Sequence, residues 1–158
     1  MKKLPNSLDC FVCGLDNEHG LKLKFYQQDD GSVVVRHIVP EQYQGYPGTV
    51  HGGILASMFD EVLGRVFMDG DFTRFMYTAR LTIRYRKPVP TGVEITIIGR
   101  AVRDRGRAAE SKAELYGPDG QLLAEADALM IDLPQEIDSA EELAALGWKV
   151  YPDEEDQP

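Results

Sequence analysis

The 158-residue sequence has only three histidines, two cysteines and one tryptophan, and it has no long hydrophobic run. A membrane-spanning helix needs about 20 consecutive apolar residues, so we expect no membrane segment. The basic start, residues 1–9, lacks the apolar stretch of a secretory signal peptide, and we therefore expect a cytoplasmic protein. The formal net charge of −9 at pH 7 argues against a nucleic-acid partner, because nucleic-acid binding needs a basic surface.

The only two cysteines, Cys10 and Cys13, form a single C-x-x-C motif near the N-terminus. A structural zinc site usually takes four ligands, and the chain has no second pair of cysteines, although Asp16 and His19 are near in sequence. A thioredoxin-like redox motif begins a helix, whereas residues 14–17 have the composition of a turn. We therefore expect reduced, packed cysteines, no metal and no resident cofactor; metal binding and redox chemistry are the alternatives.

One segment, residues 51–67, has the hydrophobic periodicity of a helix. Its polar positions gather on one stripe, which consists of Ser57, Asp60, Glu61, Gly64 and Arg65. Apolar side chains cover the rest of the circumference, so the helix must be surrounded by other parts of the protein. Gly52 and Gly53 stand at its start, where backbone N–H groups have no partner inside the helix. An anion or a developing oxyanion would be stabilised there.

The two acids of this segment have different expected roles. Glu61 precedes Arg65 by four residues, the favourable order for an ion pair, and we expect a solvated salt bridge. Asp60 has no such local partner and lies two turns beyond the glycines, so it is a candidate for catalysis. The alternative is a helix acid that faces water near a subunit contact. His51, just before the helix, is expected to cap it, with general-base catalysis as the alternative.

The rest of the chain has strand and turn patterns. Alternation of apolar and polar residues predicts six strands, at residues 21–26, 33–39, 75–87, 93–103, 107–116 and 121–131. In the third of these, strict alternation places Tyr77, Ala79 and Leu81 on one face and Thr78 on the other. Near the C-terminus, Ser139 precedes a short helical pattern, and an acidic tail that we expect to be disordered follows it.

Two strands, one apolar helix and four further antiparallel strands pose a simple packing problem, because the sheet must curl around the helix. The predicted fold class is therefore α+β, a hotdog fold with an antiparallel sheet of about five to six strands wrapped around one central helix. Uncovered strand edges favour pairing of two subunits, so we expect a homodimer or a tetramer. Residues 1–20 form an N-terminal cysteine-containing segment, 21–133 the hotdog domain, and 134–158 a short helix and tail.

A set of motifs resembles a known family. His51-Gly52-Gly53, followed after six residues by Asp60 and then by a T-x-R-L-T-I-x-Y-x-x-P strand, resembles the hotdog-fold acyl-CoA thioesterases of the phenylacetate-pathway (PaaI) type. The resemblance covers about residues 21–131, and the C-F-V-C-G segment resembles a subgroup of these proteins. It implies an enzyme that hydrolyses an acyl-CoA to a free acid and coenzyme A, which is part of the substrate. A non-catalytic hotdog protein that binds or senses acyl-CoA is the alternative.

The resemblance also implies roles for individual residues. The acid matching Asp60 acts as a nucleophile or as a general base on water, and the backbone N–H of Gly52, with Gly53 beside it, polarises the thioester carbonyl. The hydroxyl of Thr78 is expected near the site from one subunit while the acid comes from the other. The family often has an asparagine six residues before the histidine; this chain has none there, and the neighbouring Gln44 is our substitute.

Further contacts to the substrate are expected from a basic row and from one serine. Phosphate groups of coenzyme A favour arginine, and Arg80, Arg84 and Arg86 recur along one strand. A solvated outer sheet face is the alternative for each of them. Ser57 lies one turn before the acid and could touch substrate, although a serine on a polar helix stripe is the plainer account. No G-x-S-x-G motif indicates a serine nucleophile.

Overall fold

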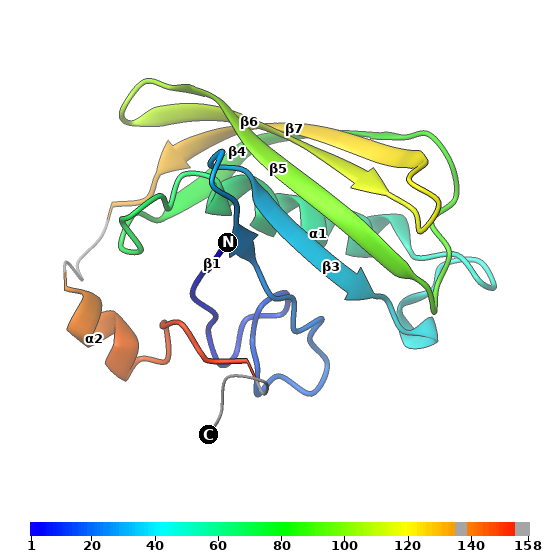
Figure 1. The fold of residues 1–158 in the computed structure, drawn as a ribbon, viewed down its shortest axis with the longest axis horizontal. Helices are drawn as coiled ribbons and strands as arrows, with labels where there is room; N and C mark the ends of the chain where they lie inside the picture. The colour runs from blue at the N-terminus through cyan, green and yellow to red at the C-terminus, as the bar shows by residue number, and fades with distance from the viewer. Residues whose placement is uncertain (135–138, 154–158) are drawn as a thin grey trace.

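A computed structural model describes residues 1–134 and 139–153, in which an antiparallel sheet wraps around one long helix, α1 (Gly52–Arg65) (Figure 1). The strands are β1 (Lys2–Lys3), β2 (Tyr26–Gln27), β3 (Val33–Ile38), β4 (Met76–Tyr85), β5 (Glu94–Asp104), β6 (Ala108–Tyr116) and β7 (Leu122–Asp132). A 3-10 turn, η1 (Glu41–Tyr43), and a short helix, α2 (Ala140–Ala145), complete the elements. No helix among the described residues is both long enough and apolar enough to cross a membrane.

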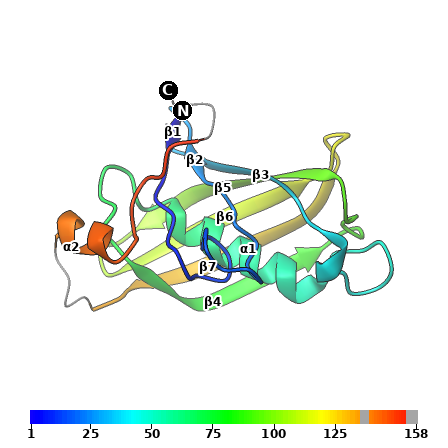
Figure 2. The ribbon, with the colours of Figure 1, turned by 90° about the horizontal axis from the view of Figure 1, so that it is seen from below.

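The sheet has seven strands in the order β1-β2-β3-β5-β6-β7-β4. This is one more than the upper prediction of six, because β1, a strand of only two residues, carries too little pattern to be predicted. All pairings are antiparallel, and the predicted α+β class is confirmed. The helix α1 lies across the concave face of the sheet. The N-terminal segment crosses the side of α1 that faces away from the sheet (Figure 2).

Close approach of helix and sheet depends on a glycine in β5. A Cβ atom at Gly99 would lie 2.6 Å from Val62 Cγ1 and 3.0 Å from Val66 Cγ1. Val62 and its neighbours Phe59 and Leu63 are fully buried, so the apolar circumference of the helix fills the core as predicted. The missing side chain at Gly99 lets α1 lie close against the sheet.

The predicted strand at residues 21–26 is mostly wrong. Leu21, Leu23 and Phe25 are buried as their alternation predicts, but only Tyr26 and the next residue enter the sheet. Lys22 has φ +54°, a left-handed conformation that a strand does not tolerate. The alternating segment instead donates irregular backbone hydrogen bonds to the N-terminal segment, whose Val12 and Phe11 carbonyls accept them.

The strand β4 contains a β-bulge that changes which side chains face the helix. Its pairing with β7 shifts between Thr78 and Arg80, so Ala79 is the additional residue. Thr78 and Leu81 are partly buried toward α1, whereas Tyr77 and Ala79 are exposed. The strict alternation predicted from the sequence, which put Thr78 opposite Leu81, is therefore wrong.

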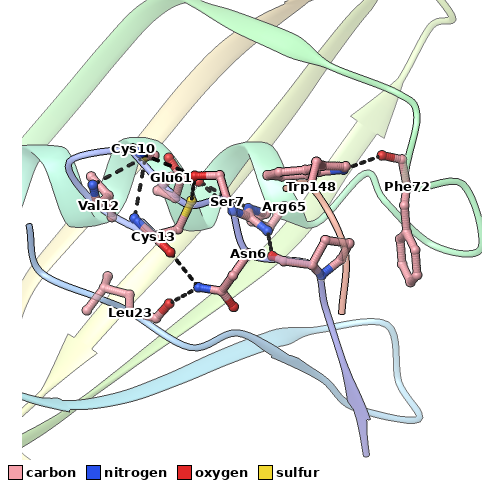
Figure 3. A network of polar contacts seen from close by, with 11 residues as sticks. Asn6, Ser7, Cys10, Val12, Cys13, Leu23, Glu61, Arg65, Phe72 and Trp148 are labelled. Atoms are coloured by element: carbon pink, nitrogen blue, oxygen red, sulfur yellow. Dashed lines mark hydrogen bonds and ion pairs between the residues drawn. The ribbon is translucent and has the colours of Figure 1, made fainter. Parts of the chain in front are cut away.

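The predicted ion pair between Glu61 and Arg65 forms, with 2.6 Å between Arg65 Nη2 and Glu61 Oε1, but it is not solvated. Arg65 is only 1% exposed, and its guanidinium lies between the rings of Phe25 and Trp148, 4.4 Å and 4.5 Å from their centroids. It also donates to the carbonyl of Pro5. The N-terminal segment and Trp148 cover this end of the helix (Figure 3), a tertiary contact that local spacing does not reveal.

The short helix of the C-terminal segment follows its prediction. Ser139 Oγ accepts a hydrogen bond from the backbone N–H of Glu142 at 3.1 Å and caps α2. Trp148 packs edge-on against the ring of Phe75 at 5.0 Å, and its indole N–H donates to the carbonyl of Phe72 at 2.8 Å. The acidic tail predicted to be disordered spans residues 152–158. This prediction is wrong for Asp153, which pairs with Lys3 and Lys24, and residues 154–158 lie outside the described residues.

Candidate active site

The start of α1 has one free backbone donor, not two. His51 is the N-cap, and its Nδ1 accepts a hydrogen bond from the N–H of Gly53 at 2.9 Å. The expected capping role of His51 is therefore confirmed, and the expectation that the Gly53 amide is open to an oxyanion is wrong. Gly52 is the first helical residue and has no acceptor inside the helix, nor does any other acceptor in the described part of the chain take its N–H.

A cavity of about 640 Å³ lies beside Gly52. Its walls come from the loop before α1, from the first turn of α1 and from residues 85–89. The hydroxyl of Tyr85 donates to the carbonyl of Gly52 at 2.7 Å, and burial raises the pKa of Tyr85, so it stays a protonated donor at neutral pH. A role for this tyrosine was not predicted from the sequence, where its only signal is its place after Leu81 and Ile83 on the inward face of the strand.

Asp60 lies at the middle of α1 and is held from β4. The hydroxyl of Thr78 donates to Asp60 Oδ1 at 2.5 Å, and the bulge at Ala79 is what turns this hydroxyl toward the helix. Both side chains are partly buried. The resemblance placed the Thr78 hydroxyl and the acid on different subunits, whereas here they meet within one chain. A carboxylate fixed by a hydroxyl keeps its other oxygen free to act on a substrate or a water.

A second cavity, of about 470 Å³, borders Asp60 and Thr78. Its other walls come from the last turns of α1, from residues 75–77 and from Met130 and Trp148. Asp60 and Gly52 are eight residues apart, so about 12 Å separates them along the helix axis. The two cavities share no residue. One chain thus carries a free amide in one hollow and an oriented carboxylate in the other.

The predicted basic row divides between two faces of the sheet. Arg86 and Lys87 border the cavity beside Gly52, although Arg86 also pairs with Glu125 at 2.8 Å. Arg80 and Arg84 are exposed and lie on the outer sheet face, and neither borders the cavity of Gly52 or that of Asp60. Their contact with substrate therefore stays a prediction, and within a single chain only Arg86 of the three borders the cavity beside Gly52.

Two further predicted substrate contacts have local structural roles. Gln44 Oε1 accepts a hydrogen bond from the backbone N–H of Gly48 at 3.1 Å, which closes the loop before α1. Ser57 Oγ donates to the carbonyl of Gly53 at 2.9 Å, one helical turn earlier. Neither residue borders either cavity of a single chain, so their contact with substrate stays a prediction.

Residues 47–124 match the family model of the thioesterase superfamily. This range contains the free amide, the carboxylate and the threonine that orients it. The match therefore covers the part of the chain that contains both the free Gly52 amide and the Asp60 carboxylate.

Relatives and solved structures agree with this match. The chain is 30% identical over 112 residues to the acyl-coenzyme A thioesterase THEM4 of Xenopus laevis, over 69% of this chain and 49% of that protein. It thus spans about half the length of the curated relatives it matches. A solved thioesterase superfamily protein has a TM-score of 0.71 at 30% identity, over 78% of this chain and 63% of that chain. The PaaI protein of E. coli has the same fold, with a TM-score of 0.64 at 18% identity over 72% and 81% of the two chains.

Proposed function

Because the chain belongs to the thioesterase superfamily, by the sequence of residues 47–124 and by its hotdog fold, we propose that it hydrolyses an acyl-CoA thioester to a free acid and coenzyme A. The THEM4 relatives named as acyl-coenzyme A thioesterases support this substrate class. The reaction needs a donor for the carbonyl oxygen and a base or nucleophile for the carbonyl carbon. The free Gly52 amide and the Asp60 carboxylate supply these two groups.

The observation that carries the proposal is the pairing of these two groups on one helix. The Gly52 N–H donates a hydrogen bond to the thioester oxygen and stabilises the negative charge that develops there, which lowers the barrier to attack. Asp60, oriented by Thr78, takes a proton from water as the water oxygen attacks the carbonyl carbon. The carbon–sulfur bond then breaks, and the coenzyme A thiolate leaves and takes up a proton. In this step the carboxylate acts on water directly, without a histidine as the base.

The two groups act on one carbonyl when two chains come together. They lie about 12 Å apart along α1 in separate cavities, which is too far for a single chain to place both beside one carbon atom. The strand β4 is a long edge of the sheet, paired only with β7 among the described residues, and such an edge favours pairing with a second copy. A homodimer with two composite sites, each built from Gly52 of one chain and Asp60 of the other, follows.

The coenzyme A moiety lies at the basic rim of the cavity beside Gly52. Arg86 and Lys87 border this cavity in a chain with a net charge of −9, and they attract the phosphates of coenzyme A. Apolar side chains of Val50, Leu55 and Val89 form the cavity's inner wall, where they exclude water from the reacting carbonyl.

A panel of short, long and aromatic acyl-CoA substrates, with the released thiol detected by a chromogenic disulfide, tests the proposal. We expect turnover of at least one substrate and a decrease in kcat of about 10²–10⁴-fold for Asp60→Asn, because general-base catalysis contributes this much. Exposed Asp69, just beyond the helix, provides the control, and Asp69→Asn keeps wild-type turnover. Full activity of a folded Asp60→Asn variant contradicts the mechanism. Tight acyl-CoA binding without any turnover would indicate a binding protein.

A further inference from the structure

The C-x-x-C motif lies against α1, directly beside the ion pair of Glu61. One donor atom from each of Cys10, Cys13 and Glu61 lies within 4.8 Å of the other two. Cys13 is buried, and the other two are partly buried (Figure 3). Donors bound to one tetrahedral zinc, with Zn–S distances of about 2.3 Å, are about 3–4 Å apart. Small side-chain rotations therefore suffice to bring the three donors onto one ion.

The backbone around the motif is shaped to hold a negatively charged sulfur. Cys10 Sγ accepts hydrogen bonds from the backbone N–H groups of Val12 at 3.3 Å and of Cys13 at 3.4 Å. A Cβ atom at Gly14 would lie 2.3 Å from the Cys10 carbonyl oxygen, so only glycine allows so tight a turn. Converging amides of this kind stabilise anions and metal-bound sulfur.

The carboxylate of Glu61 is oriented in the same way as a ligand to a metal. Arg65 Nε and Nη2 donate to Glu61 Oε1, at 3.2 Å and 2.6 Å, and no hydrogen bond in the described part of the chain occupies Oε2. Ligating carboxylates are commonly held by such an outer hydrogen bond, which fixes the direction of the free oxygen. The hydroxyl of Ser7, 3.4 Å from Cys13 Sγ, gives the second sulfur an outer partner as well.

From this geometry we propose that Cys10, Cys13 and Glu61 bind one zinc ion, with water in the fourth position. Two sulfurs and one carboxylate oxygen are ligands that zinc prefers. The charges also balance, because two thiolates, one carboxylate, the buried Arg65 and a divalent ion sum to zero. Arg65 already pairs with Glu61, so two thiolates alone would leave two uncompensated negative charges in a partly buried site, which is costly, and the divalent ion removes that cost.

The zinc ion ties the N-terminal segment to the helical turn that carries Asp60. Leu4 and Val12 of this segment already belong to the core, and the ion adds a fixed link from the segment to α1. Its role is structural, since the thioester chemistry assigned to Asp60 involves none of its ligands. Removal of the ion is therefore expected to lower the melting temperature of the full chain, whichever reaction the protein catalyses.

Metal analysis of the reduced full chain, purified without chelator, tests the site. We expect about one zinc per chain, and cobalt(II) added to the metal-free protein should give thiolate-to-cobalt charge transfer and tetrahedral d–d bands. Cys10→Ser and Glu61→Gln should each weaken zinc binding by more than about tenfold, the smallest loss seen even for outer partners of a metal site. Asp16→Asn and His19→Gln change nearby residues outside the cluster and should keep wild-type affinity.

Two results would overturn the proposal, and both are read from the wild-type chain, so a variant that fails to fold does not obscure them. One is a cobalt complex without thiolate charge transfer and with substoichiometric zinc. The other is a Cys10–Cys13 disulfide in the non-reduced protein combined with no zinc binding by the reduced protein, which would identify a redox pair. Thioesterase activity is expected to persist after metal removal as long as the chain stays folded, because the ion has no step in catalysis.

Discussion

At the scale of single residues, the two glycines of the His51-Gly52-Gly53 motif have different roles. The imidazole of His51 takes the Gly53 amide as a helix cap, and this leaves Gly52 as the free donor. A cap satisfies one orphan amide and fixes the entry of the chain into the helix, so in the proposed mechanism His51 presents the Gly52 N–H rather than acting on substrate. The proposed catalytic use of the motif therefore depends on one backbone hydrogen atom.

A proline at position 52 removes this hydrogen atom, because proline has no backbone N–H, and it leaves every other side chain unchanged. Gly52 is the first residue of α1, where proline is favoured, and His51 before it has ψ 135°, which a following proline requires. Gly52→Pro should therefore fold and lose about 10²–10³-fold in kcat, the value of one oxyanion donor.

Gly52→Ala is the matched control for this prediction. It keeps the N–H, and its added Cβ would meet the Tyr85 side chain at ordinary contact distances, 3.5 Å from the hydroxyl oxygen and 3.6 Å from Cζ. Thiol release by both variants, with helix content measured by circular dichroism, distinguishes loss of the donor from loss of fold. Equal activity of the alanine and proline variants would show that the amide has no catalytic role.

At the scale of elements, the helix was predictable and the detailed register of the sheet was not. The apolar circumference of residues 51–67 and the capping histidine are local signals, and α1 begins and ends close to where they indicate. The bulge at Ala79 has no local signal, because it depends on how β4 pairs with β7. Without it, Thr78 would have been placed on the outer face, so the contact to Asp60 could not be derived from alternation.

The packing of α1 on β5 gives a stability prediction at this scale. Gly99→Ala should lower the free energy of unfolding by about 1–3 kcal/mol, because its Cβ would lie 2.6 Å from Val62 Cγ1 and overpack the core.

Chemical denaturation of Gly99→Ala, Val62→Ala and the double variant measures the coupling between the two positions. Truncation of Val62 makes room, so the cost of Gly99→Ala should be smaller in the Val62→Ala background. Strictly additive costs would mean that the two side chains do not compete for space.

At the scale of the whole molecule, the two ends of the described chain are tied together by one carboxylate. Asp153 pairs with Lys3 Nζ at 2.6 Å and with Lys24 Nζ at 3.0 Å, and it accepts a hydrogen bond from Tyr26 at 2.8 Å. The sequence indicated none of this, because the partners are more than a hundred residues away along the chain. The burial of Arg65 between Phe25 and Trp148 also escaped prediction, because neither ring is a local neighbour in the sequence.

The Asp153 cluster predicts a pH dependence of stability. The hydrogen bond from Lys3, with those from Tyr26 and Lys24, lowers the pKa of Asp153 below its ordinary value. A carboxyl whose folded pKa is lowered stabilises the fold above its unfolded pKa of about 4, and this stabilisation is lost as the pH falls further. Asp153→Asn should therefore lower the melting temperature at pH 7, and its difference from wild type should shrink below about pH 4.

Thermal unfolding of both proteins between neutral and acidic pH measures this effect, and Asp9→Asn at an exposed site is the control. The contribution is modest because much of the cluster is open to solvent. A difference between Asp153→Asn and wild type that stays constant across this pH range would contradict the assignment.

The central claim is that Gly52 of one chain and Asp60 of another share one active site, and co-expression of two inactive variants tests it most directly. Asp60→Asn and Gly52→Pro chains should each be nearly inactive alone. In randomly mixed oligomers, about a quarter of the composite sites combine an intact Gly52 with an intact Asp60, so the mixture should recover about a quarter of wild-type turnover. If both groups acted within one chain, every chain would carry a lesion, and the mixture would stay as inactive as its parents.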